Sequence, residues 1–576
     1  MPKKSVMRKI PKIERLEKTR IRLFALTALL VVVSASLISP HSVSATETNY
    51  QNPVTATPPL ARATTPSCVV TLARTQPFPF AGYSTPFTGT YSPPISCPAP
   101  WSMVVLDFSG SVSGRQFDRM ATIWIGNAIV YMGTTPEPTP TGIAWHTEKD
   151  VSEYTPLLLS AQSYAIQVPN LITKIYTGII YINATLTFYE TGPAFPAARH
   201  PDMIVPLSGS WLFLFHRAPV NATPVTLPTN PVRAYLELWA KGNSCDEFWF
   251  GSQPDDYANA NGLCGGGAFR EIQVFLDGTL AGVVWPFPYV FTGGVNPYLW
   301  RPIPAVEAFN EPAYLLDLTP FVGTIADGNP HTMGFGIVNN GVYWQVDGNL
   351  LIDRDPVLQT ISGQLTTNQI SPGAAQSLSQ TITNHSALFS FRASRSVKTA
   401  GFVDASAGRV TTTIDQSFSF TNRQELDLVN FLENLKGTET ITTSTSTTGS
   451  QGTRRVTVSD SYPVAMTSAF MIPGAVASSN SNQATLRFIL PATVDQSFIR
   501  TVTSAVSGVP ILSTTISDNV HSEAVLVRSL TTGFNVVASG HDYEDYIMSD
   551  STGLCFNHYI AAAQGLITVD IMRPAC

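Results

Sequence analysis

Short apolar runs separated by turn-forming residues are the feature that most restricts how this chain can fold. The runs 103–106, 121–125 and 179–182 are rich in β-branched and aromatic residues and recur between segments that contain Pro or Gly. Such a pattern is typical of short β-strands at regular spacing, which pack as sandwiches. Charged residues make up only 13% of the chain, whereas hydrophobic residues make up 44%. A helical bundle would carry more Glu, Lys and Arg, and a disordered chain would carry fewer apolar residues. We therefore expect an all-β protein.

Shifts in composition divide the 576 residues into parts. Pro and Thr cluster in 46–66 and again in 218–231, and Ser, Thr, Gln and Asn dominate after Pro356. Within this last region, the apolar spacing of Glu425–Leu435 predicts one short helix. The expected parts are a signal peptide (1–45), a Thr/Pro-rich linker (46–66), a first β-sandwich (67–217), a second β-sandwich (218–355) and a C-terminal Ser/Thr-rich β domain (356–576).

The N-terminus has the three features of a secretory signal. Nine of the 34 Lys and Arg residues precede Leu23, an apolar run continues to Val33, and small residues at 43–45 predict cleavage near Ala45. The run is shorter than the roughly 20 residues of a membrane span, so we expect a secreted protein with no stable span after cleavage. The remaining chain is more acidic than the net charge of −6, which makes nucleic acid an unsuitable partner.

All six cysteines follow the leader, and an even number in an exported chain indicates disulfides. Several connectivities are open, and the three close pairs favour local bridges. The simple zinc spacings CxxC and HExxH do not occur, so we expect no metal and no other cofactor. The expected bridges are Cys68–Cys97, Cys245–Cys264 and Cys555–Cys576.

Asp118 is the first candidate catalytic residue. It lies in Gly114–Arg119, between Arg115 and Arg119, just before a predicted strand. We expect the guanidinium groups to lower the pKa of Asp118 and to keep it ionised in mild acid. The alternative is a structural ion pair at the start of a strand.

Asp246 and Glu247 form the second candidate, beside aromatic residues in the loop that a Cys245–Cys264 bridge would close. A carboxylate from each of two sandwiches could activate water or transfer a proton at a glycosidic or amide centre. The alternative is a solvated acidic loop.

Two further segments are rich in candidate ligands. The stretch 283–302 combines Trp300, Arg301 and turn residues, as expected either for a sugar site or for a sandwich core. The run His541–Tyr546, with His558 downstream, could hold a metal, but its spacing matches no defined metal loop. We therefore predict that 541–546 is a solvated acidic loop.

Six sequence blocks follow one another in order, at 114–119, 142–150, 246–249, 269–271, 284–287 and 291–303. Together they resemble the family of peptide-N-(N-acetyl-β-glucosaminyl)asparagine amidases, type A. The resemblance implies hydrolysis of the amide between an asparagine side chain and the first N-acetylglucosamine of an N-linked glycan. Products would be an aspartate and a glycosylamine. The substrates would be N-glycosylated peptides or unfolded glycoproteins, no metal is implied, and acidic pH is favoured.

A more distant likeness to type F of the same activity implies two jelly-roll sandwiches with the site between them. Its aromatic-Asp-Arg motif is similar to 117–119, which makes Asp118 the main catalytic carboxylate. Its Cys-x-Glu motif is similar to 245–247, which makes Glu247 the partner acid. Type F has a further glutamate where this chain has Gly178, so that role is either lost or supplied by another acid such as Glu148 or Asp246. The expected substrate-binding residues are Arg119, Trp145, Glu148, Asp246, Arg270, Trp300 and Arg301.

Two other functions remain open at this point. One is an endoglycosidase that cuts within the chitobiose core, and the other is a non-catalytic glycan-binding surface protein. The amidase leaves an aspartate on the peptide, whereas the endoglycosidase leaves an asparagine that carries one sugar.

Overall fold

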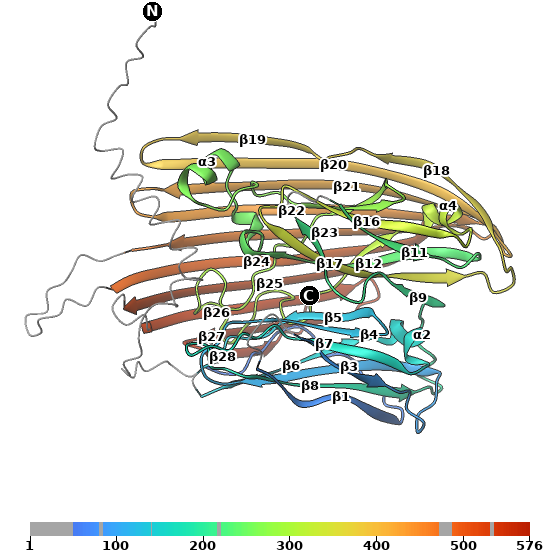
Figure 1. The fold of residues 1–576 in the computed structure, drawn as a ribbon, viewed down its shortest axis with the longest axis horizontal. Coiled ribbons are helices and arrows are strands. Elements are labelled where there is room, and N and C mark those ends of the chain that lie inside the picture. The colour runs from blue at the N-terminus through green and yellow to red at the C-terminus, as the bar shows by residue number, and fades with distance from the viewer. Residues whose placement is uncertain (1–49, 80–84, 140, 216–219, 472–486, 530–534) are drawn as a thin grey trace, which may run out of the picture.

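The computed structural model describes residues 50–576 except 80–84, 140, 216–219, 472–486 and 530–534. Strands dominate it (Figure 1), which confirms the expected all-β class. The predicted signal peptide lies outside the described residues. Within them no helix is long and apolar enough to cross a membrane. The α-helices of this part are α2 (Thr155–Leu158), α3 (Asp255–Asn261) and α4 (Val322–Ile325), and the short 3-10 turns are η2 (Ser152–Tyr154), η3 (Ser244–Asp246), η4 (Trp249–Gly251) and η5 (Thr319–Phe321).

The first eight strands form a sandwich of two four-stranded sheets with the orders β1-β8-β3-β6 and β2-β7-β4-β5. Two facing sheets with these connections form a jelly roll. The strands are β1 (Ser67–Phe78), β2 (Phe87–Tyr91), β3 (Trp101–Val112), β4 (Met120–Ile125), β5 (Ala128–Thr134), β6 (Ile143–Asp150), β7 (Gln162–Gln167) and β8 (Ile180–Glu190).

A second sandwich repeats this topology strand for strand, with the orders β10-β17-β12-β15 and β11-β16-β13-β14. The sequence-based interval 67–217 for the first sandwich includes β9 and β10, but both of these strands pair with β17. The strands are β9 (Met203–Pro206), β10 (Leu212–Phe215), β11 (Val220–Thr226), β12 (Pro231–Asn243), β13 (Glu271–Leu276), β14 (Thr279–Val284), β15 (Tyr314–Asp317), β16 (Pro330–Val338) and β17 (Tyr343–Arg354).

Alternation along the strands builds the core of each sandwich. On β8, Ile182, Leu186 and Phe188 are fully buried, because side chains at every second position point to the same face. Gly110 on β3 leaves room for the indole of Trp145, which a Cβ at this glycine would approach to 2.4 Å. Trp145, expected to bind substrate, is therefore a core residue of the first sandwich, 5% exposed.

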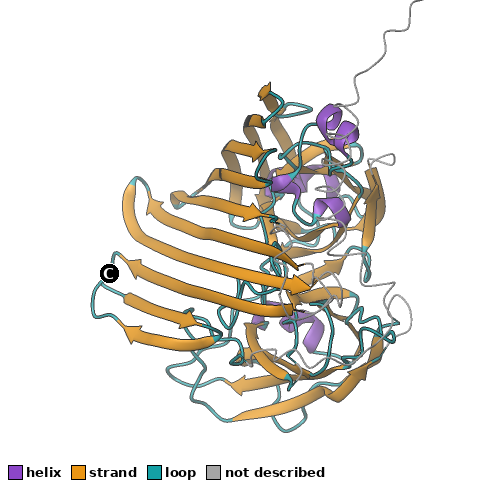
Figure 2. Cartoon of the chain, turned by 90° about the vertical axis from the view of Figure 1, so that its left-hand side faces the viewer, coloured by secondary structure: helices purple, strands orange, loops and turns teal. Residues whose placement is uncertain are grey.

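The C-terminal region is one antiparallel sheet with the order β18-β20-β21-β22-β23-β24-β25-β26-β27-β28, and β19 also pairs with β20. It curves around one side of both sandwiches (Figure 2). Phe418 and Phe420 pack against Trp285 and Phe269 of the second sandwich. The strands are β18 (Ser362–Ile370), β19 (Ala375–Ile382), β20 (Ser386–Ala405), β21 (Gly408–Asp427), β22 (Leu432–Gly449), β23 (Gly452–Ala469), β24 (Arg487–Val506), β25 (Val509–Ser529), β26 (Asn535–Asp550), β27 (Cys555–Ala563) and β28 (Leu566–Met572).

Two local predictions for this region are wrong. Glu425–Leu435 is not a helix but the end of β21, the turn after it and the start of β22, because the two strands pair with each other here. His541–Tyr546 is not a solvated loop but part of β26, and its alternate residues Asp542, Glu544 and Tyr546 are buried.

The described part of the predicted linker forms no helix or strand, yet its beginning is fixed in place. We call residues 50–56 the N-terminal strap. The backbone N–H of Gln51 donates to the carbonyl of Gly565 (2.8 Å), and that of Val54 donates to the carbonyl of Pro302 (3.1 Å). The backbone N–H of Ala56 donates to Glu544 Oε2 (2.7 Å). The strap therefore joins the loop 285–313 to the C-terminal sheet.

The six cysteines form the three predicted disulfides, Cys68–Cys97, Cys245–Cys264 and Cys555–Cys576. The second of these bridges closes the loop that carries Glu247.

Candidate functional site

Asp118 lies in the irregular segment between β3 and β4, where the end of β5 holds it. Thr134 Oγ1 donates to Asp118 Oδ2 (3.4 Å). The next residue, Arg119, is bound through its backbone N–H to Thr135 Oγ1 (2.9 Å) and through its carbonyl to the N–H of Thr135 (2.8 Å). The guanidinium of Arg119 donates to Gln116 Oε1 (2.7 Å). The backbone that directly follows Asp118 is therefore anchored at the end of β5.

The pKa of Asp118 is raised to about 7, so the sequence-based expectation of a lowered pKa is wrong. Burial is the main cause, and the negative charge of Glu247 adds to it. Arg119 and Lys241 act in the opposite direction but do not outweigh these effects. Desolvation of the charged form, which the sequence does not reveal, decides the direction of the pKa shift of Asp118.

Glu247 follows the short turn η3, directly after β12 of the second sandwich. Burial raises the pKa of Glu247, and Lys241 counteracts part of this rise. Because the charge of Glu247 acts on Asp118, these two carboxyls, one from each sandwich, lie within electrostatic reach of each other.

Asp246 and Arg270 form an ion pair inside the second sandwich, with Arg270 Nε 2.7 Å from Asp246 Oδ1 and neither residue exposed. Asp246 also accepts the backbone N–H groups of Gly341 and Val342. Both residues were expected to bind substrate. Their burial instead makes them anchors for the backbone that carries Glu247.

Lys241 and Glu311 belong to the same group of charges, and sequence reasoning missed both. Lys241 lowers the pKa of Asp118, Glu247 and Glu311 alike. Glu311 lies in a segment that pairs with the edge strand β5, since its N–H donates to the carbonyl of Met132 (2.9 Å). Burial raises the pKa of Glu311 to about 8, and both of its carboxyl oxygens are buried with no hydrogen-bond partner among the described residues. No motif marks either residue, because tertiary packing and not local sequence places them in this group of charges.

Glu148, suggested as the third acid, is engaged elsewhere, since Arg62 Nη2 lies 2.8 Å from Glu148 Oε1. Asp107, His146 and Glu148 could together reach one metal ion, but the guanidinium of Arg62 also bonds to Asp107 and supplies the positive charge there. The second suggestion, Asp246, is held by Arg270.

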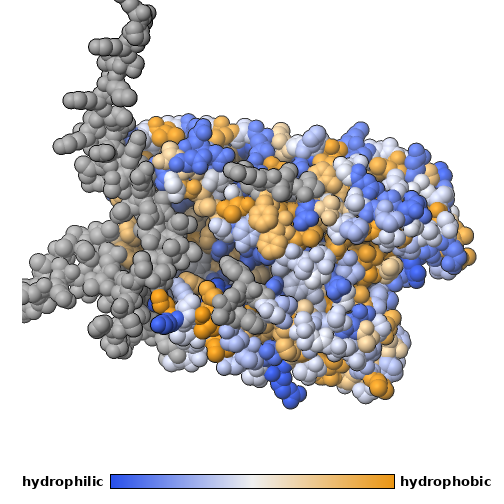
Figure 3. All heavy atoms as spheres, viewed as in Figure 1, coloured by the Kyte–Doolittle hydropathy of each residue, from blue (hydrophilic) through white to orange (hydrophobic). Residues whose placement is uncertain are grey.

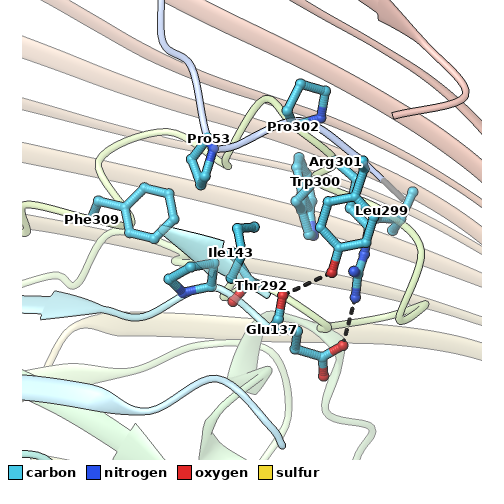
Figure 4. A pocket seen from close by; sticks show the side chains of 11 residues that line it. Pro53, Glu137, Ile143, Thr292, Leu299, Trp300, Arg301, Pro302 and Phe309 are labelled. Atoms are coloured by element: carbon cyan, nitrogen blue, oxygen red, sulfur yellow. Dashed lines mark hydrogen bonds and ion pairs between the residues drawn. The ribbon is translucent and has the colours of Figure 1, made fainter. Parts of the chain in front are cut away.

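Trp300 and Arg301 line a small pocket under the N-terminal strap (Figure 4). Arg301 Nη2 lies 2.8 Å from Glu137 Oε2, and its guanidinium lies 4.2 Å from the ring centroid of Tyr50. Trp300 is 4% exposed, and its backbone N–H donates to Ser522 Oγ (3.2 Å). These contacts join the strap, the loop after β5 and the C-terminal sheet.

Fold and site together define a double jelly-roll protein in which carboxyl groups from both sandwiches lie within electrostatic reach of one lysine. Residues 55–371, more than half of the chain, match the family model described as "Peptide N-acetyl-beta-D-glucosaminyl asparaginase amidase A". The chain belongs to this family, which confirms the resemblance seen in the sequence.

A curated relative is peptide-N4-(N-acetyl-beta-glucosaminyl)asparagine amidase A of Prunus dulcis, which is 36% identical over 364 residues. The match covers 59% of this chain and 64% of the relative, so the chain spans just under two thirds of the relative's length.

Solved structures of PNGase F from Flavobacterium meningosepticum and of PNGF-II are also similar to this chain. The first has a TM-score of 0.35 and 16% identity over 50% of this chain and 96% of its own. The second has a TM-score of 0.35 and 12% identity over 50% and 65% of the two chains. At this level of similarity, no residue role is transferred from them.

Proposed function

We propose that this protein hydrolyses the amide bond between asparagine and the first N-acetylglucosamine of N-linked glycans. Family membership and the activity for which the Prunus dulcis relative is named support this reaction. The observation that carries it is the electrostatic coupling of Asp118 from one sandwich with Glu247 from the other, next to Lys241.

The two acids can divide the proton transfers between them. With its pKa raised to about 7, Asp118 keeps its proton in mild acid, and we assign the ionised role to Glu247. Ionised Glu247 removes a proton from the attacking water, whose oxygen bonds to the amide carbon. Asp118 donates its proton to the amide nitrogen as the carbon–nitrogen bond breaks. The products are an aspartate and a glycosylamine.

Lys241 and Glu311 complete this proposed site. The ammonium group of Lys241 favours the ionised form of Glu247, as its effect on the pKa of that group indicates. Glu311 takes the place of the third acid, since it shares this lysine and holds a proton at neutral pH. Arg119, anchored beside Asp118, is the proposed substrate-binding residue of the first sandwich.

The substrates we propose are N-glycosylated peptides or unfolded glycoproteins, met outside the cell after export through the signal at 1–45. Three disulfides support an oxidising location.

Digestion of a glycopeptide, followed by mass analysis of the former glycosylation site, tests the reaction. We expect an aspartate. An asparagine that retains one sugar would identify an endoglycosidase, and an unchanged glycopeptide would identify a glycan-binding protein.

Asp118→Asn and Glu247→Gln should each lower kcat by about 10²–10⁴-fold, the usual contribution of a general acid or base. Asp415→Asn, at an exposed carboxylate on β21, is the matched control. Full activity of Asp118→Asn would remove Asp118 from the mechanism.

A further inference from the structure

The outer face of the sheet β10-β17-β12-β15 is only partly covered by the first sandwich. On the covered part, Trp124 Nε1 of β4 donates to Asp347 Oδ2 (2.8 Å). Asn349 Nδ2 donates to the carbonyl of Ile129 on β5 (2.7 Å). The face continues past this contact towards the ends of β10 and β12, where Lys241 lies.

Strand register places three aromatic residues on the same face as Lys241. Lys241 is opposite Gln345, and Gln345 is opposite Phe213. One step along, Phe215 is opposite Tyr343. Residues opposite each other in an antiparallel sheet project to the same side. Two strand spacings separate Lys241 from Phe213, which is about 10 Å.

The rings of Phe213, Phe215 and Tyr343 form one cluster, which we call the aromatic platform. Their centroids lie 5.9–6.0 Å apart, and the two phenylalanine rings are stacked with an interplanar angle of 11°. Phe213 is 43% exposed and Phe215 is 49% exposed. In the surface view, apolar residues gather near the middle of the face over the region of β17 (Figure 3).

We propose that the aromatic platform binds sugar rings of the glycan that lie beyond the first N-acetylglucosamine. This inference rests on the proposed function, because it places the scissile amide beside Lys241. A pyranose ring has an apolar C–H face that stacks on an aromatic ring, and hydroxyl groups at its edge that need polar partners. Gln345, between Lys241 and Phe213, offers both an amide donor and an acceptor for such hydroxyls.

Continuity with the site favours a sugar over a peptide as the occupant. The platform shares a sheet face with Lys241 and lies at a distance that a short run of linked sugar rings spans. The three rings also carry no formal charge, which suits a neutral glycan. A peptide side chain on the platform would instead make affinity depend on the peptide and not on glycan length.

The experiment measures binding of free oligosaccharides by titration calorimetry, with N,N′-diacetylchitobiose and the core pentasaccharide of N-glycans as probes. For the native protein we expect tighter binding of the pentasaccharide. In the double variant Phe213→Ala/Phe215→Ala, the affinity ratio of pentasaccharide to chitobiose should fall at least about threefold, the loss expected for one or two aromatic stacking contacts. The single variant Phe213→Trp keeps a stacking surface, so its affinity ratio should stay at the native value.

Leu315→Ala is the matched control, because Leu315 is 63% exposed on β15, at the opposite edge of the same sheet. It should leave the ratio unchanged. An unchanged ratio in the double variant, or no preference of the native protein for the longer glycan, would overturn the platform. A loss of affinity in the double variant that is seen with a glycopeptide but not with the free oligosaccharides would overturn it as well. Length-dependent glycan binding in a protein that does not cleave glycopeptides would contradict the amidase and leave the platform standing.

Discussion

At the scale of single residues, the proton on Asp118 determines how activity depends on pH. Its pKa is raised to about 7, so the group is protonated below that value and loses its proton above it. If Asp118 is the acid of the reaction, kcat/KM falls as pH rises through about 7. Since kcat/KM reports the free enzyme, a profile measured with one glycopeptide from pH 4 to about pH 9 checks this. Activity that rises through the same range would assign Asp118 the role of a base.

Lys241 provides a second test at this scale. Its positive charge lowers the pKa of both Asp118 and Glu247, so Lys241→Met should raise both pKa values and move the whole profile of kcat/KM to higher pH. Lys436→Met, at an exposed lysine on β22, is the control and should leave the profile in place. An unmoved profile in Lys241→Met would separate Lys241 from the reacting acids.

The sequence alone could suggest Asp118 and Glu247 as catalytic residues, but it could not predict their protonation states. The Phe-Asp-Arg and Cys-x-Glu motifs are visible in the sequence, whereas burial, which reverses the expected pKa shift of Asp118, depends on tertiary packing. Glu311 could not be found from sequence, because it joins the site only when its segment pairs with β5.

At the scale of elements, the buried pair of Asp246 and Arg270 holds the turn that carries Glu247. Arg270→Met leaves Asp246 buried without its counter-charge, so the free energy of unfolding should fall by about 3–5 kcal/mol. Arg233→Met, which breaks the exposed pair with Asp353, should cost about 1 kcal/mol or less. Urea denaturation of both variants checks the contrast. Equal losses would mean that the buried pair does not stabilise the turn.

Strands were predictable where one face meets a core and the other meets water. The regular alternation on β8 is such a case. Prediction failed where the inward-facing residues are themselves polar, as at Asp542 and Glu544 on β26. It also failed at Glu425–Leu435, where long-range pairing of β21 with β22 outweighs a helical spacing of apolar residues.

At the scale of the whole molecule, carboxyl groups are buried between the C-terminal sheet and the sandwiches. Burial raises the pKa of Glu307 and Glu544 to about 7, and it raises the pKa of Asp518 and Glu439 as well. Each group binds its proton more tightly in the folded than in the unfolded chain. Their protonation therefore favours folding in acid, and the free energy of unfolding should decrease as pH rises from about 4.3, the value of an unfolded Glu, towards 7.

Glu439→Gln tests this directly, because both carboxyl oxygens of Glu439 are buried with no hydrogen-bond partner in the described part of the chain. The glutamine cannot ionise, so the difference between the urea midpoints at pH 5 and pH 8 should shrink. Glu425→Gln, at an exposed residue on the neighbouring strand, should leave that difference as it is. A midpoint difference that Glu439→Gln does not alter would contradict the assignment.

The N-terminal strap has a consequence for the order of events during synthesis. Thr55 and Ala56 bind Glu544 at sequence separations of 489 and 488 residues, and Gln51 binds Gly565. Domains fold as they leave the ribosome, N-terminal ones first. Both sandwiches can therefore fold before the residues that bind the N-terminal strap have been synthesised. The earliest described stretch to emerge is thus among the last to dock, because its partners at 544 and 565 are synthesised long after it.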